Sequence, residues 1–262
     1  MDRVKEIVSI ECQIVEKDKE LCINDANAME LYHCANARSI RVVWTLEELG
    51  GSLAHAAGGY TLRTLPFPPR ARHREFLKTN VLGTVPHFDD RSSEGGALEM
   101  TESCAIPLYL AQRYGAQLAV APSEPAFGEF LNWCFHADAT LTFPQTVVLR
   151  YTLQEPGRAD AAATDYAKWY VARLRKLDNA LKDGREFLVA GRLTVADICI
   201  TYALWMGGTL YAPGDEEPLS ARYQPQTRAY LDRMVARPAF QRALEAQERS
   251  EEAFEAALSS KL

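Results

Sequence analysis

The chain has 262 residues, of which 47% are hydrophobic and 10% aromatic, and its formal net charge is −6. This length suits two modest domains, and the composition is typical of a globular protein. The excess of acidic residues argues against a nucleic-acid-binding groove, which needs clustered lysine and arginine. No run reaches the roughly 18 apolar residues that a membrane-spanning helix requires, so we expect no membrane association.

The cysteines form neither CxxC pairs nor zinc-ligand spacings. They lie far apart in the chain, at Cys12, Cys22, Cys34, Cys104, Cys134 and Cys199. An even count in a long chain without an export signal is typical of reduced thiols. The sequence therefore predicts a cytoplasmic protein without a metal site.

The first 28 residues differ in pattern from the rest of the chain, with a strand or ragged helix at Val4–Ile14 and a charge run at Glu16–Glu20. At Met29 an alternating pattern begins, as in a half-buried strand, and it extends to His33. Residues 1–28 are therefore either a genuine N-terminal extension or a segment upstream of the real start at Met29.

After this strand we expect a loop over Cys34–Ala37 and a helix over Arg38–Leu49, because apolar residues recur there at helical spacing. Gly50 and Gly51 then provide a left-handed stop for the helix. A weak strand is expected near Leu53–Tyr60, ahead of a proline-rich loop.

A short helix is predicted at Arg74–Lys78, followed by strands at Pro86–Asp89 and Ala97–Met100 that turn residues join. A further helix is predicted over Glu102–Tyr114, although Pro107 lies inside it and removes a backbone donor. Residues 29–115 are thus predicted to be an α/β domain in the order strand-helix-strand-helix-strand-strand-helix.

Residues 116–126, with Pro122 and Pro125, are predicted to be a linker, and residues 127–262 an all-helical domain. Thr194 and Asp197 have the spacing of a capping box at a helix start. An apolar stripe precedes them and ends at a glycine; it consists of Tyr170, Leu174, Leu177 and Leu181, with Gly184 as the stop.

The most informative stretch is Asn80–Pro86, a turn that leads into a Val-Pro bond, with the polar helix start Met100–Ile106 about one hairpin later. Helix N-termini bind anions because their first N–H groups are unpaired. The two motifs, in this order, resemble the glutathione site of the glutathione S-transferase family, N-P-x-G-x-V-P and then E-S-x-A-I. Over Met29–Ala243 the resemblance implies a thioredoxin-like N-terminal domain, an all-α C-terminal domain and a homodimer.

The resemblance implies that the second motif binds the γ-glutamyl part of glutathione. Ser103 would donate to the carboxylate and Glu102 would pair with the ammonium. The alternative is that Thr101 and Ser103 only cap the helix.

The resemblance also implies a cis peptide bond between Val85 and Pro86, which would present the Val85 backbone to the cysteinyl part of the ligand. A plain strand-initiating proline is the alternative. Arg72 is the expected partner of the glycyl carboxylate, and Thr84 stands where relatives often have lysine. Arg72 belongs to a basic segment that also contains His73, Arg74 and Lys78.

The thiol helper departs from the family pattern, since Ala37 stands at the place of the usual serine or cysteine and Arg38 at that of the Beta-type cysteine. Ser39 and Asn36 can donate a hydrogen bond and Arg38 adds positive charge, which both favour the thiolate. Such a bond contributes roughly 1.5–3 kcal/mol, or about one to two pKa units. We therefore expect Ser39, Asn36 and Arg38 to be catalytic, although Ser39 can equally cap the helix. Cys34 is a minor candidate for mixed-disulfide chemistry.

A second substrate would lie against the helical domain, where aromatic residues gather with a few polar atoms. Trp133, His136, Phe143 and Tyr151 suit the lining of an apolar pocket. Core packing is the alternative for most of them. Asp138 on the same stretch is a candidate to reach the ligand of a neighbouring subunit.

The implied function is a cytoplasmic glutathione transferase active in detoxification, with glutathione as co-substrate and a small hydrophobic electrophile as acceptor. One alternative is a glutathione-dependent peroxidase or disulfide reductase similar to the Nu class. The other is a non-catalytic glutathione-binding or regulatory protein, which Ala37 keeps open.

Overall fold

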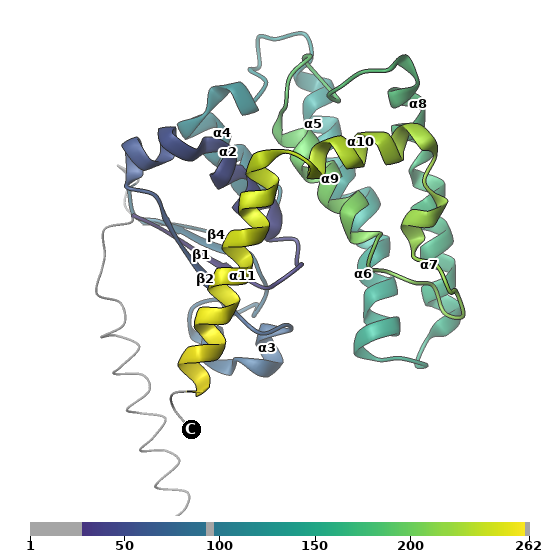
Figure 1. Ribbon diagram of the computed structural model, residues 1–262, viewed down its shortest axis with the longest axis horizontal. Helices are drawn as coiled ribbons and strands as arrows, with labels where there is room; N and C mark the ends of the chain where they lie inside the picture. The colour runs from purple at the N-terminus through teal and green to yellow at the C-terminus, as the bar shows by residue number, and fades with distance from the viewer. Residues whose placement is uncertain (1–27, 93–96, 260–262) are drawn as a thin grey trace, which may run out of the picture.

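The computed structural model describes residues 28–92 and 97–259. The expectations for the N-terminal 27 residues and for the end of the Asp90–Gly96 turn lie outside the described residues. The N-terminal half contains a four-stranded mixed sheet with strand order β2-β1-β3-β4, in which β1 pairs parallel to β2 and antiparallel to β3 (Figure 1). Its elements are β1 (Met29–His33), α2 (Ile40–Ala57), β2 (Tyr60–Thr64), α3 (Pro69–Arg72), η1 (Arg74–Lys78), β3 (His87–Asp90), β4 (Leu98–Met100) and α4 (Ala105–Tyr114).

The alternation of apolar and polar residues in β1 determines which side chains of this strand face the core. Met29, Leu31 and His33 are fully buried, whereas the two residues between them are only partly covered. Helices α2 and α4 pack against one another beside this sheet, so the core of the N-terminal half lies between the sheet and these helices. The alternating pattern thus correctly predicted a half-buried strand, and β1 lies inside the sheet between β2 and β3.

The expected strand near Leu53–Tyr60 is wrong, because the chain is helical up to Ala57 and β2 follows at Tyr60–Thr64. Gly50 does adopt a left-handed conformation, with φ of 41°, but it only kinks the helix. Leu49 and Leu53 are both buried, so the apolar face continues across the kink and keeps the chain helical.

Pro107 is compatible with α4 because the helix begins at Ala105. The proline therefore occupies the first turn, where its missing N–H would have no intrahelical partner. The preceding residues, 101–104, form the turn that feeds the helix.

The C-terminal half is helical, as predicted, and two of its helical turns are π-helical. Its elements are η2 (Ala116–Leu118), α5 (Phe127–Phe135), η3 (His136–Thr142), α6 (Phe143–Leu149), η4 (Arg150–Gln154), α7 (Asp160–Arg173), α8 (Arg175–Ala180), η5 (Leu181–Asp183), α9 (Val195–Met206), η6 (Leu219–Arg222), α10 (Pro225–Val235) and α11 (Pro238–Ser259). The π-helical turns are η3 and η4. An α/β half followed by a helical half confirms the expected fold class.

Helix α9 forms the centre of this half, and nearly all of its side chains are buried. The predicted capping box is present at its start, where the Asp197 carboxylate accepts hydrogen bonds from the Thr194 backbone and hydroxyl. The same carboxylate accepts from Leu188 N and Tyr230 Oη, so it ties two neighbouring segments to α9. The predicted apolar stripe from Tyr170 to Leu181 is likewise buried.

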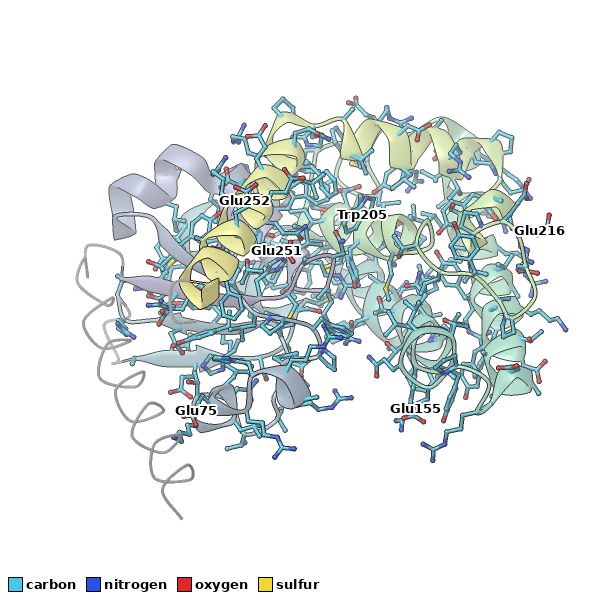
Figure 2. All side chains as sticks on the ribbon, turned by 60° about the horizontal axis from the view of Figure 1, so that its bottom comes forward. Glu75, Glu155, Trp205, Glu216, Glu251 and Glu252 are labelled. Carbon is cyan, nitrogen blue, oxygen red and sulfur yellow. The ribbon has the colours of Figure 1, made fainter. Side chains whose placement is uncertain are left out.

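The last helix, α11, returns to the N-terminal half and packs on α2 and β2 (Figure 1). Arg237 and Arg242 pair there with Glu48 and Glu47 of α2. Figure 2 marks the exposed residues Glu251 and Glu252 near the end of this helix. The last helix therefore lies beside the edge strand β2. In the described part of the chain, no helix has the length and apolar character to cross a membrane.

Candidate functional site

The loop between β1 and α2 carries the three predicted catalytic residues. Ala37 N donates to Cys34 O, which closes a tight turn, and Asn36 within it is left-handed with φ of 58°. Asparagine tolerates this conformation better than most residues. Asn36 is exposed and Arg38 is partly exposed, so both are accessible to a ligand.

Ser39 is fully buried, unlike its two neighbours in the prediction. Its hydroxyl lies 2.8 Å from Nδ1 of His33, the last residue of β1. Burial lowers the pKa of His33 to about 4, so this imidazole is neutral at physiological pH. The Ser39 side chain is thus engaged inside the protein. His33 was not singled out from sequence, because a buried histidine at a strand end carries no local signature.

Cys34 is also buried, and its pKa is raised to about 12 by burial and, secondarily, by the charge of Glu251. A thiol with so high a pKa is a poor source of thiolate at neutral pH. Cys34, Cys104, Cys134 and Cys199 are all free.

The Val85–Pro86 peptide bond is cis, as the resemblance implied. The turn before it is held by Asn80, whose amide donates to Thr84 O and whose side-chain oxygen accepts from Leu82 N. Val85 and Pro86 are buried, whereas Thr84 is exposed. The Asn80 side chain thus shapes the turn that presents the cis bond.

Gly83 is a second requirement of this turn. Its φ is 57°, and an added Cβ would lie 2.7 Å from Cβ of Arg70 and 2.8 Å from Cδ2 of Leu77. Only glycine fits here without displacing the neighbouring segment.

The Glu102–Ser103 turn precedes α4. Glu102 is exposed, whereas Ser103 is buried and its hydroxyl accepts a hydrogen bond of 2.8 Å from Nη1 of Arg41. The N-cap residue of α4 is Cys104, and its side chain makes no capping hydrogen bond. Ser103 is therefore oriented by a partner from α2.

Arg41 is the residue that sequence reasoning missed at this end of the site. Its side chain is fully buried, its Nη1 also lies 3.0 Å from Oδ1 of Asp138, and its Nη2 donates to Thr142 Oγ1 at 2.8 Å. Its guanidinium stacks over the Tyr202 ring at 4.7 Å. Arg41 therefore joins α2 and the α4 turn to the helical half. The sequence signal that could have indicated its burial is that Arg41 lies within the apolar run Ile40–Trp44 of a predicted helix.

The basic segment is placed on the surface. Arg72 ends α3 and is exposed, as are Arg74 and Lys78 of η1, where Lys78 pairs with Glu75. His73 packs its ring against Phe254 of α11. The structure brings this segment toward the cis bond through Phe76, which shares a small buried cluster with Val85.

A pocket of about 440 Å³ lies between the two halves of the chain. It is lined by Arg38, Asp138, Ala139, Phe143 and Thr146. Arg38 Nη2 donates to Thr146 Oγ1 at 3.1 Å, and its Nη1 lies 3.9 Å from Asp138. Phe143 is 53% exposed, so an apolar ring stands open beside a guanidinium. Asp138 and Ala139 belong to the π-helical turn η3, a distortion that is frequent at functional sites.

The other predicted pocket residues lie elsewhere. Trp133 is buried in the core, and His136 sets its ring edge-on against it. Burial, with help from nearby Lys176 and Arg173, lowers the pKa of His136 to about 4. Tyr151 lies in η4 under the Arg150 guanidinium. Phe143 is thus the member of the predicted set that lines the pocket described above. Within the described residues, no group of histidine, cysteine and acidic side chains forms a metal site.

Comparisons with known proteins agree with this architecture. Residues 145–238 match the family model "Glutathione S-transferase, C-terminal domain". The glutathione transferase URE2P8 from Phanerochaete chrysosporium, solved with oxidized glutathione, is similar with a TM-score of 0.71 at 21% identity, covering 87% of this chain and 99% of that one. A glutathione transferase family member from Pseudomonas fluorescens pf-5 with two glutathione bound has a TM-score of 0.71 at 24% identity, covering 87% and 96%.

Among curated proteins, human elongation factor 1-gamma is 29% identical over 201 residues, which are 68% of this chain and 42% of that protein. The chain thus spans about two fifths of the length of the curated relatives it matches. Residues 145–238 thus match the C-terminal domain of glutathione S-transferases, and the chain has the fold of the similar solved transferases, with a thioredoxin-like N-terminal half and a helical C-terminal half.

Proposed function

We propose that this protein is a glutathione transferase that joins the sulfur of glutathione to an electrophilic carbon of a small hydrophobic compound. The pocket between the two halves carries the proposal, because it combines Arg38 from the loop after β1 with Phe143 from the helical half. A cation and an open aromatic ring in one pocket suit a thiolate and an apolar acceptor. Glutathione bound in the structurally similar transferases supports the choice of thiol.

In this proposal, the γ-glutamyl end of glutathione binds at the α4 turn and the cysteinyl part at the cis bond. Ser103, which Arg41 orients, donates to the carboxylate, and the exposed Glu102 pairs with the ammonium. The Val85 backbone pairs with the cysteinyl backbone as an added strand does. At the other end, Arg72 and Thr84 are the proposed contacts of the glycyl carboxylate.

The chemical step is attack by the glutathione thiolate on carbon. A C–S bond forms, the leaving group departs with its electron pair, and the thiol proton passes to water. Arg38 favours the thiolate by charge and Asn36 by donating a hydrogen bond. Ser39 is the third expected helper. Its buried hydroxyl faces His33 and not the ligand, so in this proposal Ser39 only supports the conformation of the loop that carries Asn36 and Arg38.

The proposal is tested by calorimetric titration with glutathione, together with ultraviolet absorbance of the bound thiolate and turnover of 1-chloro-2,4-dinitrobenzene. We expect Glu102→Ala to weaken glutathione binding about tenfold, because it removes a charge-assisted contact. Glu99→Ala is the matched control, since Glu99 is also an exposed glutamate and lies on β4. Equal affinities of the two variants would contradict the placement of the γ-glutamyl group. Absence of thiolate and turnover would contradict the transferase.

A non-catalytic glutathione-binding protein is the second candidate. It is favoured by Ala37 at the usual helper position and by the internal hydrogen bond of Ser39. Similarity to elongation factor 1-gamma, which is named for a role in elongation, points in the same direction. Binding of glutathione without thiolate absorbance or turnover, with peroxide and disulfide acceptors also tested, would support this candidate.

We also propose a cytoplasmic homodimer that acts in detoxification, as the family resemblance implies. Sedimentation velocity tests the dimer directly, and a single species with the mass of one chain would contradict it.

A further inference from the structure

Gln247 of the last helix makes contacts with the loop after the first strand. Its Oε1 lies 3.0 Å from His33 Nε2 and also 3.0 Å from the backbone N of Asn36. Its amide nitrogen donates to Asn36 Oδ1 at 3.3 Å. Gln247 is only 5% exposed, so these contacts are made in a buried setting. One side chain therefore contacts both the end of β1 and the left-handed residue of the loop.

The Asn36 contact determines the orientation of the Gln247 amide. A backbone N–H can only donate, so the group that faces Asn36 N must be the side-chain oxygen. The same oxygen faces His33 Nε2, which must then carry the imidazole proton. Nδ1 of His33 is left as an acceptor, and the Ser39 hydroxyl must donate to it. The hydrogen bonds thus run in one direction, from Ser39 through His33 to Gln247.

This direction has a consequence for the proposed thiol site. The Ser39 hydroxyl hydrogen is committed to His33, so it is not available to a bound thiolate. Asn36, in contrast, has its backbone N–H and its side-chain oxygen fixed by Gln247 while the residue stays exposed. The conformation of the loop is therefore set by a residue from the opposite end of the chain.

Other contacts hold α11 in the place that this geometry needs. Ser250, one helical turn after Gln247, accepts from Thr64 N and donates to Leu62 O of the edge strand β2. Further along, Phe254 packs on a buried cluster that contains Cys34, Leu65, Phe76 and Val85. The helix therefore contacts the loop after β1 and the buried cluster that contains Val85, the residue before the cis proline.

We propose that Gln247 is a positioning residue for glutathione, which fixes the Asn36 loop through its side-chain amide and so couples the last helix to the thiol end of the site. This inference rests on the proposed function, since it assigns a role toward the same ligand. Gln247 acts through Asn36 and His33 and does not contact the ligand itself. The neutral state of His33, maintained by its burial, keeps the direction of the hydrogen bonds fixed.

The experiment compares Gln247→Met with Gln247→Glu in the full-length chain. Methionine has a similar length but leaves the buried N–H groups of Asn36 and His33 without an acceptor, so we expect the glutathione Kd to rise about tenfold. Glutamate keeps an acceptor for both N–H groups but loses the donor to Asn36 Oδ1, so it should restore the Kd only in part, to about threefold above that of the wild type. Gln241→Met is the matched control, because Gln241 is an exposed glutamine on the same helix whose amide donates to Val235 O.

The position of the His33 proton provides a second readout that a merely structural role would not change. In nitrogen NMR spectra of the wild type, we expect the Nε2–H form of His33, and in Gln247→Met a mixture of the two neutral forms. A lower melting temperature in Gln247→Met with an unchanged glutathione Kd and an unchanged proton position would overturn the inference. Wild-type protein that binds no glutathione would instead overturn the proposed function, and this inference with it.

Discussion

At the α4 end of the proposed glutathione site Arg41 and Ser103 are buried, whereas at its thiol end Asn36 in the loop after β1 is exposed. At the α4 end, Arg41 lies in the core and joins Ser103 to Asp138 and Thr142 of the helical half. At the thiol end, Asn36 lies at the surface, and its backbone N–H donates a hydrogen bond to the buried Gln247 side chain. The conformation of the α4 end therefore depends on a charged network between the two halves. The conformation of the thiol end depends on a chain of hydrogen bonds between neutral groups.

The largest effect is expected at the buried network. Arg41→Met should lower the free energy of unfolding by about 3–5 kcal/mol, because it leaves the polar partners of a buried charge without their donor. Urea unfolding followed by circular dichroism measures it. Arg38→Met, which alters a partly exposed guanidinium, should cost less than about 1 kcal/mol. Equal losses in the two variants would contradict the contrast between the two ends.

The neutral chain at the thiol end predicts a pH dependence of stability. The pKa of His33 is about 4 in the folded protein, against 6.5 ordinarily, because burial disfavours the charged form. The unfolded state therefore takes up a proton first, so stability is full above pH 6.5 and falls as the pH is lowered toward 4. The loss reaches about 3 kcal/mol below pH 4. His136, also shifted to about 4, acts in the same direction.

Unfolding in urea at pH 7 and at pH 4.5 measures this loss in the wild type and in His33→Gln. The glutamine retains a donor and an acceptor but does not titrate, so the difference between the two pH values should shrink. His136→Gln is the control for the second histidine. An unchanged difference in His33→Gln would show that His33 is not buried as described.

A smaller loss is expected at the turn before the cis bond. Gly83→Ala should cost about 2 kcal/mol, because it combines a left-handed conformation with contacts of 2.7 and 2.8 Å to Arg70 and Leu77. Gly157→Ala isolates the conformational part, since Gly157 has φ of 78° and an added Cβ there would have no neighbour within 4 Å among the described residues. We expect it to cost about 1 kcal/mol in urea unfolding. A loss at Gly83 no greater than at Gly157 would contradict the close approach of Arg70.

The smallest effect on stability is expected in the pocket, where the effect on activity should be clear. Phe143→Ala removes a ring that is 53% exposed, so the free energy of unfolding should change by less than about 1 kcal/mol. The kcat/KM for 1-chloro-2,4-dinitrobenzene should fall about tenfold, because apolar contact with the acceptor is lost. Phe135→Ala is the control, since Phe135 is 66% exposed on α5 and does not line this pocket. Equal activity of both variants would place the acceptor elsewhere.

Much of the fold was predictable because its signals are local. The alternation in β1, the capping box at Thr194 and Asp197, and the apolar stripe that begins at Tyr170 each arise within a few residues. The strand expected near Leu53 failed because two glycines were interpreted as the end of a helix. In the structure, burial of Leu53 on the same face as Leu49 keeps the helix going past Gly50.

Some features of the candidate site could likewise be predicted from the sequence, and others depend on the packing of distant segments. The cis bond at Val85–Pro86 was expected only from the family resemblance of its motif, whereas the turn at Ser103 was expected from a short polar helix start. Whether Ser39 is exposed or buried was not predictable, since its partner His33 gives no sign of burial beyond the alternation of a strand. Trp133 and Phe143 are both aromatic residues on the same stretch of chain, yet only the packing of the helices places one in the core and the other in a pocket.

The sequence by itself determined the order of strands and helices, the turn that leads into the Val85–Pro86 bond and the polar start of α4. These features follow from backbone preferences and periodicity, which act over a few residues. Only the tertiary structure decided that Arg41 meets Asp138, 97 residues later, and that His33 meets Gln247, 214 residues later. Such partners are selected by the need to satisfy buried polar groups, and that need arises only once distant segments have packed together.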